Sequence, residues 1–211
     1  MTLSTDARLN DRKVTRQLGG FSRKQGIWGD TLMRNIRLVG TGFYAGFALL
    51  AVAAYLIHEA AHWIVGAALG YPVSYGINSV VSASPMTAGD RMLMSAAGPA
   101  VTVVTALIAF DFVMRRESLI GYAVLYFALF MRVIAAGVSV FNLNDEARIS
   151  DMLGLGPWLL PSLVVLVLLI PTVIASRRLR LSWKVNALAY VVSSLVATAV
   201  VGLDMLHRGA I

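Results

Sequence analysis

Five apolar runs, each long enough to cross a bilayer, constrain the fold of this chain more than any other feature of its sequence. They extend over residues 41–69, 92–114, 119–141, 157–175 and 185–206. A helix that spans the hydrocarbon core needs about 20 mostly apolar residues, and within lipid each backbone polar group must be satisfied internally. The chain is only 14% charged, whereas soluble domains carry roughly 25%. The sequence therefore predicts an all-α, multi-pass protein of the cell membrane, a bundle of about five transmembrane helices in contact with the lipid bilayer.

The connection between the first two runs has a different character from the rest of the chain. The stretch YPVSYGINSVVSAS, residues 71–84, is rich in Val, Tyr and Ser and is broken by Gly and Pro. Short runs of such residues bounded by turn formers are typical of strands. We expect a short β-like hairpin or a re-entrant loop packed against the bundle, because irregular backbone near a bilayer needs protein or water partners. A plain surface loop is the alternative.

The distribution of basic residues predicts the orientation and the domain organisation. If the N-terminus lies inside, 14 of the 18 Lys and Arg residues fall in inner segments, as the positive-inside rule requires. Residues 1–39 then form a basic cytoplasmic tail, for which no nucleic-acid partner is expected. Residues 40–211 form one polytopic domain, with a candidate catalytic core at about 41–156.

The first apolar run contains the motif His58-Glu59-Ala60-Ala61-His62. Positions i and i+4 share one face of a helix, so both imidazoles can bind a single metal ion. Glu59 is offset about the helix axis by roughly 100° and can act on a water molecule at the metal without being a ligand itself. Ionisable groups at membrane depth are costly and usually functional. The motif predicts a Zn²⁺ site with His58 and His62 as ligands and Glu59 as the catalytic base.

A catalytic zinc site normally has three protein ligands, and the chain has no cysteine and only one other histidine, His207 beside Arg208 at the end of the last run. The third ligand is therefore expected to be a carboxylate at the outer ends of the helices, near the motif. The acidic residues there are Asp90, Asp145, Glu146 and Asp151. Three of these lie in the segment FNLNDEARISD, residues 141–151.

An early transmembrane HExxH motif, a later Ala-Gly-Pro segment (residues 97–99) and an Asn-Asp segment beyond it resemble the site-2 proteases, a family of intramembrane zinc metalloproteases. The resemblance covers about residues 41–156. It implies that Asp145 is the third ligand and that Asn142 or Asn144 contacts the substrate. Glu146 and Ala147 stand where the family has paired glycines, and Thr102 stands where Asn is common.

Two aspartates compete for the role of third ligand. Asp151 follows Asn142 at a spacing similar to that in the family, whereas Asp145 directly follows the third apolar run and keeps the Arg148 and Ile149 positions of the family motif. On a helix a step of six residues turns about 600°, so the two carboxylates point to different sides. We expect Asp145 to bind the metal and Asp151 to face solvent.

These features predict a zinc-dependent endopeptidase that cleaves a membrane protein or transmembrane peptide in or near its transmembrane segment. Orientation by charge places the site toward the outer face, whereas the better-known members of the family cut near the cytoplasmic side. Two alternatives remain. One is a non-proteolytic metal-binding membrane protein, such as a regulatory pseudoprotease or a metal transporter. The other is a gluzincin-type membrane peptidase with Glu146 as the third ligand.

Overall fold

The computed structural model describes residues 39–207. Its helices and strands follow in the order α2 (Thr41–Ala68), β1 (Val73–Tyr75), β2 (Val80–Ser82), α3 (Ala88–Arg116), α4 (Leu119–Val138), α5 (Asp145–Met152), α6 (Leu159–Arg178) and α7 (Trp183–His207). The predicted basic tail falls almost entirely outside the described residues.

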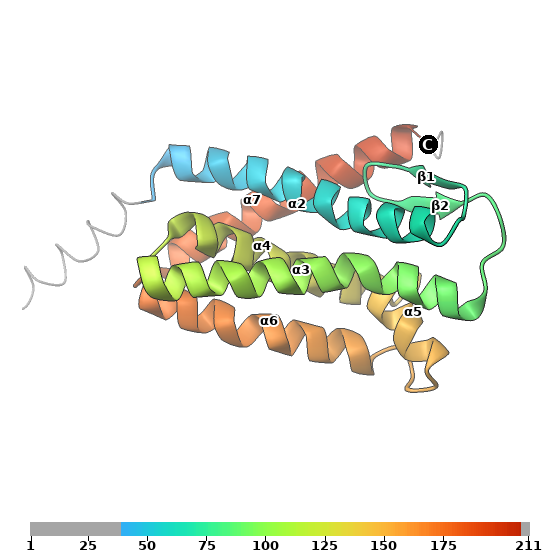
Figure 1. Ribbon diagram of the computed structural model, residues 1–211. Coiled ribbons are helices and arrows are strands. Elements are labelled where there is room, and N and C mark those ends of the chain that lie inside the picture. The colour runs from blue at the N-terminus through green and yellow to red at the C-terminus, as the bar shows by residue number, and fades with distance from the viewer. Residues whose placement is uncertain (1–38, 208–211) are drawn as a thin grey trace, which may run out of the picture. The chain divides into compact units, whose positions relative to one another are not determined.

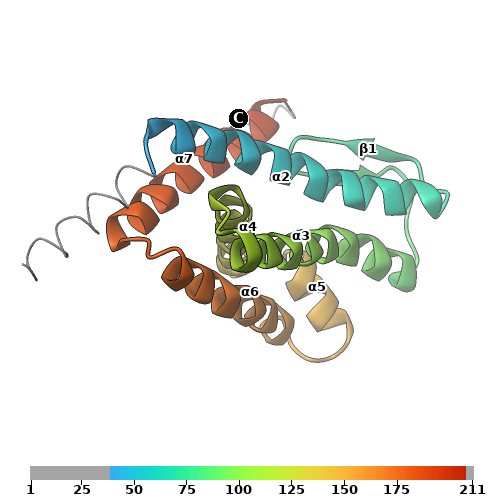
Figure 2. The same ribbon diagram turned by 60° about the vertical axis from the view of Figure 1, so that its left-hand side comes forward.

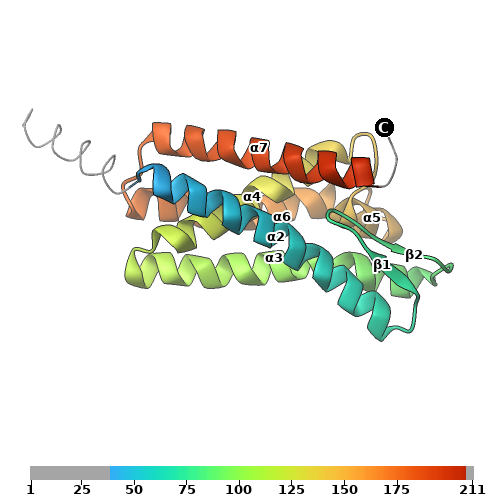
Figure 3. The same cartoon turned by 90° about the horizontal axis from the view of Figure 1, so that it is seen from above.

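The helices α2, α3, α4, α6 and α7 are each long and apolar enough to cross a membrane. They run side by side in alternating directions, and the hairpin and α5 lie at the same end of the bundle (Figures 1 and 3). The prediction of five long apolar helices with a short hairpin after the first is confirmed. Their insertion into a membrane stays a prediction.

The second long helix begins at Ala88, earlier than the expected start at Met92. The Thr87 side chain accepts a hydrogen bond from the backbone N–H of Asp90 at 3.2 Å, and its hydroxyl donates to the Asp90 carboxylate at 2.7 Å. Such a cap satisfies an N–H group that has no partner within the helix. A polar first turn therefore extends α3 beyond its apolar run.

The third long helix ends at Val138, whereas the apolar run continues to Phe141. The Ser139 hydroxyl donates to the Ala135 carbonyl at 2.8 Å and accepts the backbone N–H of Asn144 at 3.2 Å. These bonds turn the chain sharply between α4 and α5. The turn brings the start of α5 back toward the bundle, where the candidate site lies.

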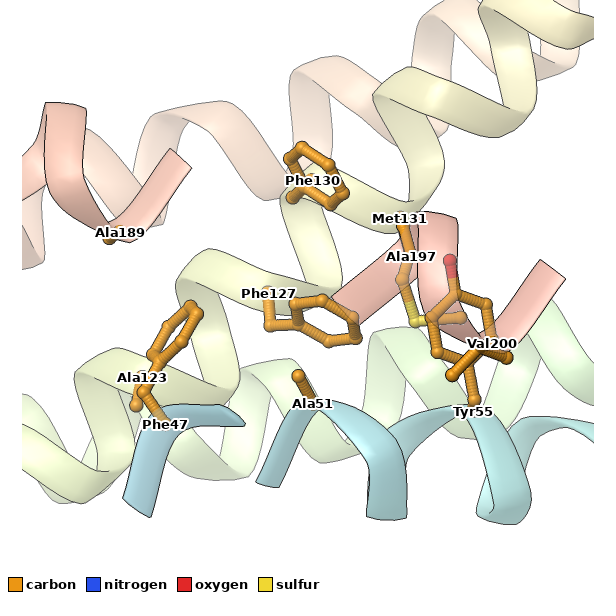
Figure 4. Close-up of a cluster of buried hydrophobic side chains, with 10 residues drawn as sticks. All are labelled: Phe47, Ala51, Tyr55, Ala123, Phe127, Phe130, Met131, Ala189, Ala197 and Val200. Carbon is orange, nitrogen blue, oxygen red and sulfur yellow. The ribbon is translucent and has the colours of Figure 1, made fainter. Parts of the chain in front are cut away.

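The core of the bundle is built around α4, which lies among α2, α3, α6 and α7 (Figure 2). Half of the residues in its most apolar stretch are buried, compared with a third or less in the corresponding stretches of the other long helices. One cluster of buried side chains joins α4 to α2 and α7, with Phe47, Tyr55 and Phe127 among its largest members (Figure 4). A second cluster joins α4 to α3 and α6.

The hairpin is anchored to the last long helix. Its strands pair antiparallel, with Ser74 opposite Val81. Asp204 of α7 is buried and accepts the backbone N–H groups of Ile77 and Asn78 at 3.0 and 3.2 Å. These two residues form the turn, whose ends are joined by a hydrogen bond from Gly76 N–H to the Ser79 carbonyl at 2.7 Å. The carboxylate therefore holds the hairpin against the bundle rather than leaving it as a free surface loop.

Candidate functional site

Three side chains from α2 and α5 converge at the hairpin end of the bundle. Nε2 of His58 lies 3.2 Å from Nε2 of His62, and Oδ2 of Asp145 lies 3.4 and 3.3 Å from these two nitrogens. Both histidines are buried, and they come from one face of α2. Asp145 is the first residue of α5 and is delivered by the turn after α4. The three atoms form a small, nearly equilateral triangle.

The size of this triangle matches a zinc site. Nitrogen and oxygen ligands bind zinc at about 2.0–2.1 Å, so in a tetrahedron they lie about 3.3–3.4 Å from one another. The observed separations are 3.2, 3.3 and 3.4 Å. Among the described residues, His58, His62 and Asp145 are the group whose donor atoms could hold a metal ion together. Two imidazoles and one carboxylate would leave the fourth position open, as in catalytic zinc sites.

Helix α3 orients both imidazoles. Nδ1 of His62 lies 2.6 Å from the Met94 carbonyl oxygen, which only accepts, so this nitrogen carries the hydrogen. Nδ1 of His58 lies 3.1 Å from Oγ1 of Thr102, whose hydroxyl donates to the Gly98 carbonyl at 2.9 Å and therefore accepts from the ring. The lone pairs of both histidines are thereby directed to Nε2, toward Asp145. Such outer partners fix the tautomer and orientation of metal-binding histidines.

Local sequence patterns did not reveal the roles of Met94 and Thr102. A usable signal was present, because Met94, Gly98 and Thr102 are spaced by four residues and share one face of α3. That face lies against the two histidines of α2. What the sequence did not show is that this face, rather than another, would meet the motif.

Gly98 allows α3 to approach the site. A Cβ atom at this position would lie 2.6 Å from Nε2 of His58 and would also collide with the ring of His62. Real Cβ atoms are essentially never found so close to another heavy atom. A residue larger than glycine does not fit in the Ala-Gly-Pro segment, because the space its side chain would need is occupied by the two imidazoles.

We expect Gly98→Ala to disturb the metal site more than the fold. The added methyl group must displace one or both imidazoles, and disturbed ligand orientation costs about 10- to 100-fold in metal affinity. Zinc affinity of the purified protein, measured by chelator competition, checks this. Gly137→Ala is the matched control, because a Cβ atom at Gly137 of α4 meets nothing within 4 Å. Equal zinc affinity in the two variants would contradict the assigned role of Gly98.

The Asp145 carboxylate is also held from its second oxygen. Nη1 of Arg148 lies 3.7 Å from Oδ1 of Asp145 and donates to Oγ of Ser95 on α3 at 3.0 Å. The positive charge of Arg148 favours the ionised form of the carboxylate, which is the form that binds a metal.

The other acidic candidates are placed elsewhere. Asp151 is exposed on α5. Glu146 is buried, and its Oε1 accepts from Nη1 of Arg132 at 2.9 Å. Asp90 caps α3 through Thr87 and accepts from the Tyr71 hydroxyl at 2.7 Å. None of these three joins the convergent group, and neither does His207, which is exposed at the end of α7.

The site opens into a cavity of about 950 Å³ between the helices and the hairpin. Glu59 is buried and lines this cavity together with the three convergent residues. The predicted substrate-contacting residues Asn142 and Asn144 line it as well. Asn142 is exposed, whereas the side-chain amide of Asn144 donates to the Ala135 carbonyl at 3.3 Å and so is partly used within the protein. Their role toward a substrate stays a prediction.

The wall of the cavity is more polar than the helices around it. Its wall carries the motif residues and several other charged or polar side chains, although the helices around it are apolar. Water can therefore be stabilised there by hydrogen bonds.

Comparisons of the chain with protein-family models, with curated proteins and with solved structures found no match.

Proposed function

We propose that this protein is a zinc-dependent intramembrane endopeptidase, similar to the site-2 proteases. The observation that carries the proposal is the convergence of His58 Nε2, His62 Nε2 and Asp145 Oδ2 to within 3.2–3.4 Å of one another. The same cavity wall carries Glu59, which is not among the three convergent residues. Two histidines and one carboxylate as ligands, with a separate glutamate as base, are the residues of a hydrolytic metal site.

The chemistry divides between the metal and the protein. A bound zinc ion would supply Lewis-acid chemistry, polarising a carbonyl group and lowering the pKa of water to about 7. Glu59 accepts one proton from the water molecule whose oxygen bonds to the carbonyl carbon of the substrate. It then delivers that proton to the peptide nitrogen as the C–N bond breaks, so one water molecule is consumed for each bond cleaved. Proton transfer by such a group contributes about 10²- to 10⁴-fold to the rate.

Apolar surroundings favour one class of substrate. The five long helices expose large apolar side chains on their outer faces, as Leu49 of α2 and Leu195 of α7 illustrate. Such surfaces favour a lipid bilayer as the environment of the protein. A substrate that reaches the cavity from lipid is a transmembrane segment of another protein. It must unwind locally, because the carbonyl groups of an intact helix are hydrogen-bonded within the helix.

The hairpin offers a surface for the unwound segment. The sheet has two strands, and residues 80–82 of β2 line the cavity. Val81 is half exposed on this strand. An extended peptide can add to a sheet edge through main-chain hydrogen bonds. In this mode the substrate lies along the hairpin with its carbonyl groups directed toward Glu59 and the convergent triad.

Metal analysis of the full chain in detergent tests the proposal at its base. We expect about one zinc ion per chain in the wild-type protein and much less in His58→Ala, since a catalytic site needs all three ligands. His207→Ala is the matched control, because His207 is exposed and does not join the convergent group. Wild-type protein that binds no zinc would overturn the proposal. A wild-type protein that binds zinc but cleaves no transmembrane reporter would favour a non-proteolytic metal-binding protein.

The basic residues and the bundle together predict which side of the membrane the site faces. The C-terminal ends of α3 and α6 carry Arg115, Arg116, Arg177 and Arg178 and lie at the end of the bundle opposite the hairpin and α5 (Figure 1). Positively charged connections favour the cytoplasmic side. We therefore propose that the N-terminus is cytoplasmic and that the site lies toward the outer face.

Reporter fusions check this orientation. A reporter joined before Thr41 is expected to lie on the cytoplasmic side of the membrane. A reporter joined after Ile211 is expected to lie on the opposite side. Removing the charges of residues 115, 116, 177 and 178 by substitution with Gln should weaken this preference. The reverse pattern in the wild-type protein would place the site on the cytoplasmic side.

A further inference from the structure

A buried ion pair lies directly beside the candidate metal site. Nη1 of Arg132 on α4 donates to Oε1 of Glu146 on α5 at 2.9 Å, and the two side chains are 4% and 5% exposed. Glu146 is the residue that follows the ligand Asp145, and Arg132 lines the cavity. The pair therefore connects the central helix of the bundle to the first turn of the helix that supplies the third ligand.

Stability alone does not account for this pair. Removing two charges from water is so costly that a well-packed apolar pair of similar size is often as stable or more stable. Within the described part of the chain, Nε of Arg132 is buried and has no hydrogen-bond partner. The guanidinium is thus only partly satisfied, which weakens any net stabilisation. Charged groups at such positions in membrane helices usually serve a function.

The geometry around Asp145 indicates what that function is. On its N-terminal side, the backbone and side-chain amides of Asn144 donate to Ser139 Oγ and to the Ala135 carbonyl at 3.2 and 3.3 Å. On its C-terminal side, Glu146 is held by Arg132. Both neighbours of Asp145 are therefore tied to the C-terminal part of α4 and to Ser139, which directly follows it. The ligand's own backbone is fixed between two anchors.

We propose that the Arg132–Glu146 pair is a positioning device for Asp145, which sets the metal affinity of the site by fixing the first turn of α5 against α4. The inference rests on the proposed metal site. A charge-assisted hydrogen bond is directional, so it fixes the rotation of this turn and directs Oδ2 of Asp145 toward His58 and His62. Apolar packing in its place would keep the helices together without fixing that rotation.

The test compares zinc affinity with folding in the full chain. In Arg132→Met/Glu146→Leu, we expect the metal-free protein to unfold at or above the wild-type temperature, because no unpaired charge is left buried. We expect its zinc dissociation constant to rise about 10- to 100-fold, the usual effect of losing an outer-shell partner. The visible spectrum of the Co²⁺-substituted protein should also change, because the orientation of the carboxylate ligand is altered.

A second ion pair provides the control. Nε of Arg115 lies 2.7 Å from Oδ1 of Asp111 in an exposed pair near the C-terminal end of α3. Arg115→Met/Asp111→Leu likewise removes one positive and one negative charge from the chain. It should leave the zinc dissociation constant and the Co²⁺ spectrum unchanged. Wild-type zinc affinity in Arg132→Met/Glu146→Leu would overturn the positioning role. Wild-type protein that binds no zinc would instead overturn the proposed function.

A conservative variant keeps the inference testable if the double variant does not fold. Arg132→Lys retains both charges but loses the planar geometry of the guanidinium group. We expect it to fold and to have a zinc affinity between that of the wild-type protein and that of a variant without the pair. A wild-type dissociation constant in Arg132→Lys, with the double variant unfolded, would show that the pair serves folding alone and would overturn the proposal.

Discussion

Glu59→Gln is expected to keep its fold and its zinc while losing about 10²- to 10⁴-fold in the rate of peptide cleavage. Glutamine has nearly the same shape as glutamate but cannot accept the proton of water. Glu59 is not one of the three convergent residues, so the metal content should not change. Zinc content, thermal unfolding and cleavage of a transmembrane reporter in proteoliposomes measure the three parts of this expectation.

Glu117→Gln is the matched control for this variant. Glu117 is exposed at the end of α3 and lies 3.3 Å from Arg178, at the end of the bundle opposite the site. The same chemical change there should leave cleavage at the wild-type rate. If Glu59→Gln cleaves the reporter as fast as the wild-type protein, the proposed proton transfer is wrong. If the variant loses zinc, Glu59 contributes to metal binding instead.

The second large effect concerns the third ligand. Asp145→Ala is expected to abolish cleavage and to lower zinc affinity strongly. The loss of affinity should exceed the effect of losing an outer-shell partner, which is about 10- to 100-fold. The reason is that Oδ2 of Asp145 lies 3.4 and 3.3 Å from the two histidine nitrogens and completes the donor set. Chelator competition and reporter cleavage measure the two consequences.

Asp151→Ala serves as the control because Asp151 lies on the same short helix and is exposed. Its removal should change neither zinc affinity nor cleavage. If metal loss followed Asp151 instead, the assignment of the third ligand would be wrong, and the proposed metalloprotease would use another ligand set. Equal effects of both substitutions would indicate that α5 as a whole supports the site.

Local features of the sequence were sufficient to predict the helices and two of the three convergent residues. The long apolar runs predict helices because a helix satisfies its backbone groups within its own segment, whatever surrounds it. The motif likewise depends on local spacing, since His58 and His62 share a face of any helix that contains them. The boundaries were less certain because they depend on polar caps, such as Thr87 before α3 and Ser139 after α4.

The tertiary structure decided the features that depend on contacts between distant segments. The sequence left four outer carboxylates as candidate ligands, and the turn after α4 brings Asp145 to the histidines while Glu146 pairs with Arg132. Spacing could not distinguish these neighbours, because the choice depends on how α5 is rotated against α3 and α4. From the sequence, the choice of Asp145 rested on its place directly after the third apolar run and on a family resemblance, whereas the structure provides a distance.

Other parts of the site were beyond any local pattern. Thr102 meets His58 across 44 positions of the chain, and Asp204 holds the hairpin turn across more than a hundred. The sequence by itself determined that apolar helices form and that two imidazoles lie on one of them, because both follow from the geometry of a single helix. Only the tertiary structure decided which carboxylate, which glycine and which polar partners surround those imidazoles, because these depend on the packing of several helices against one another.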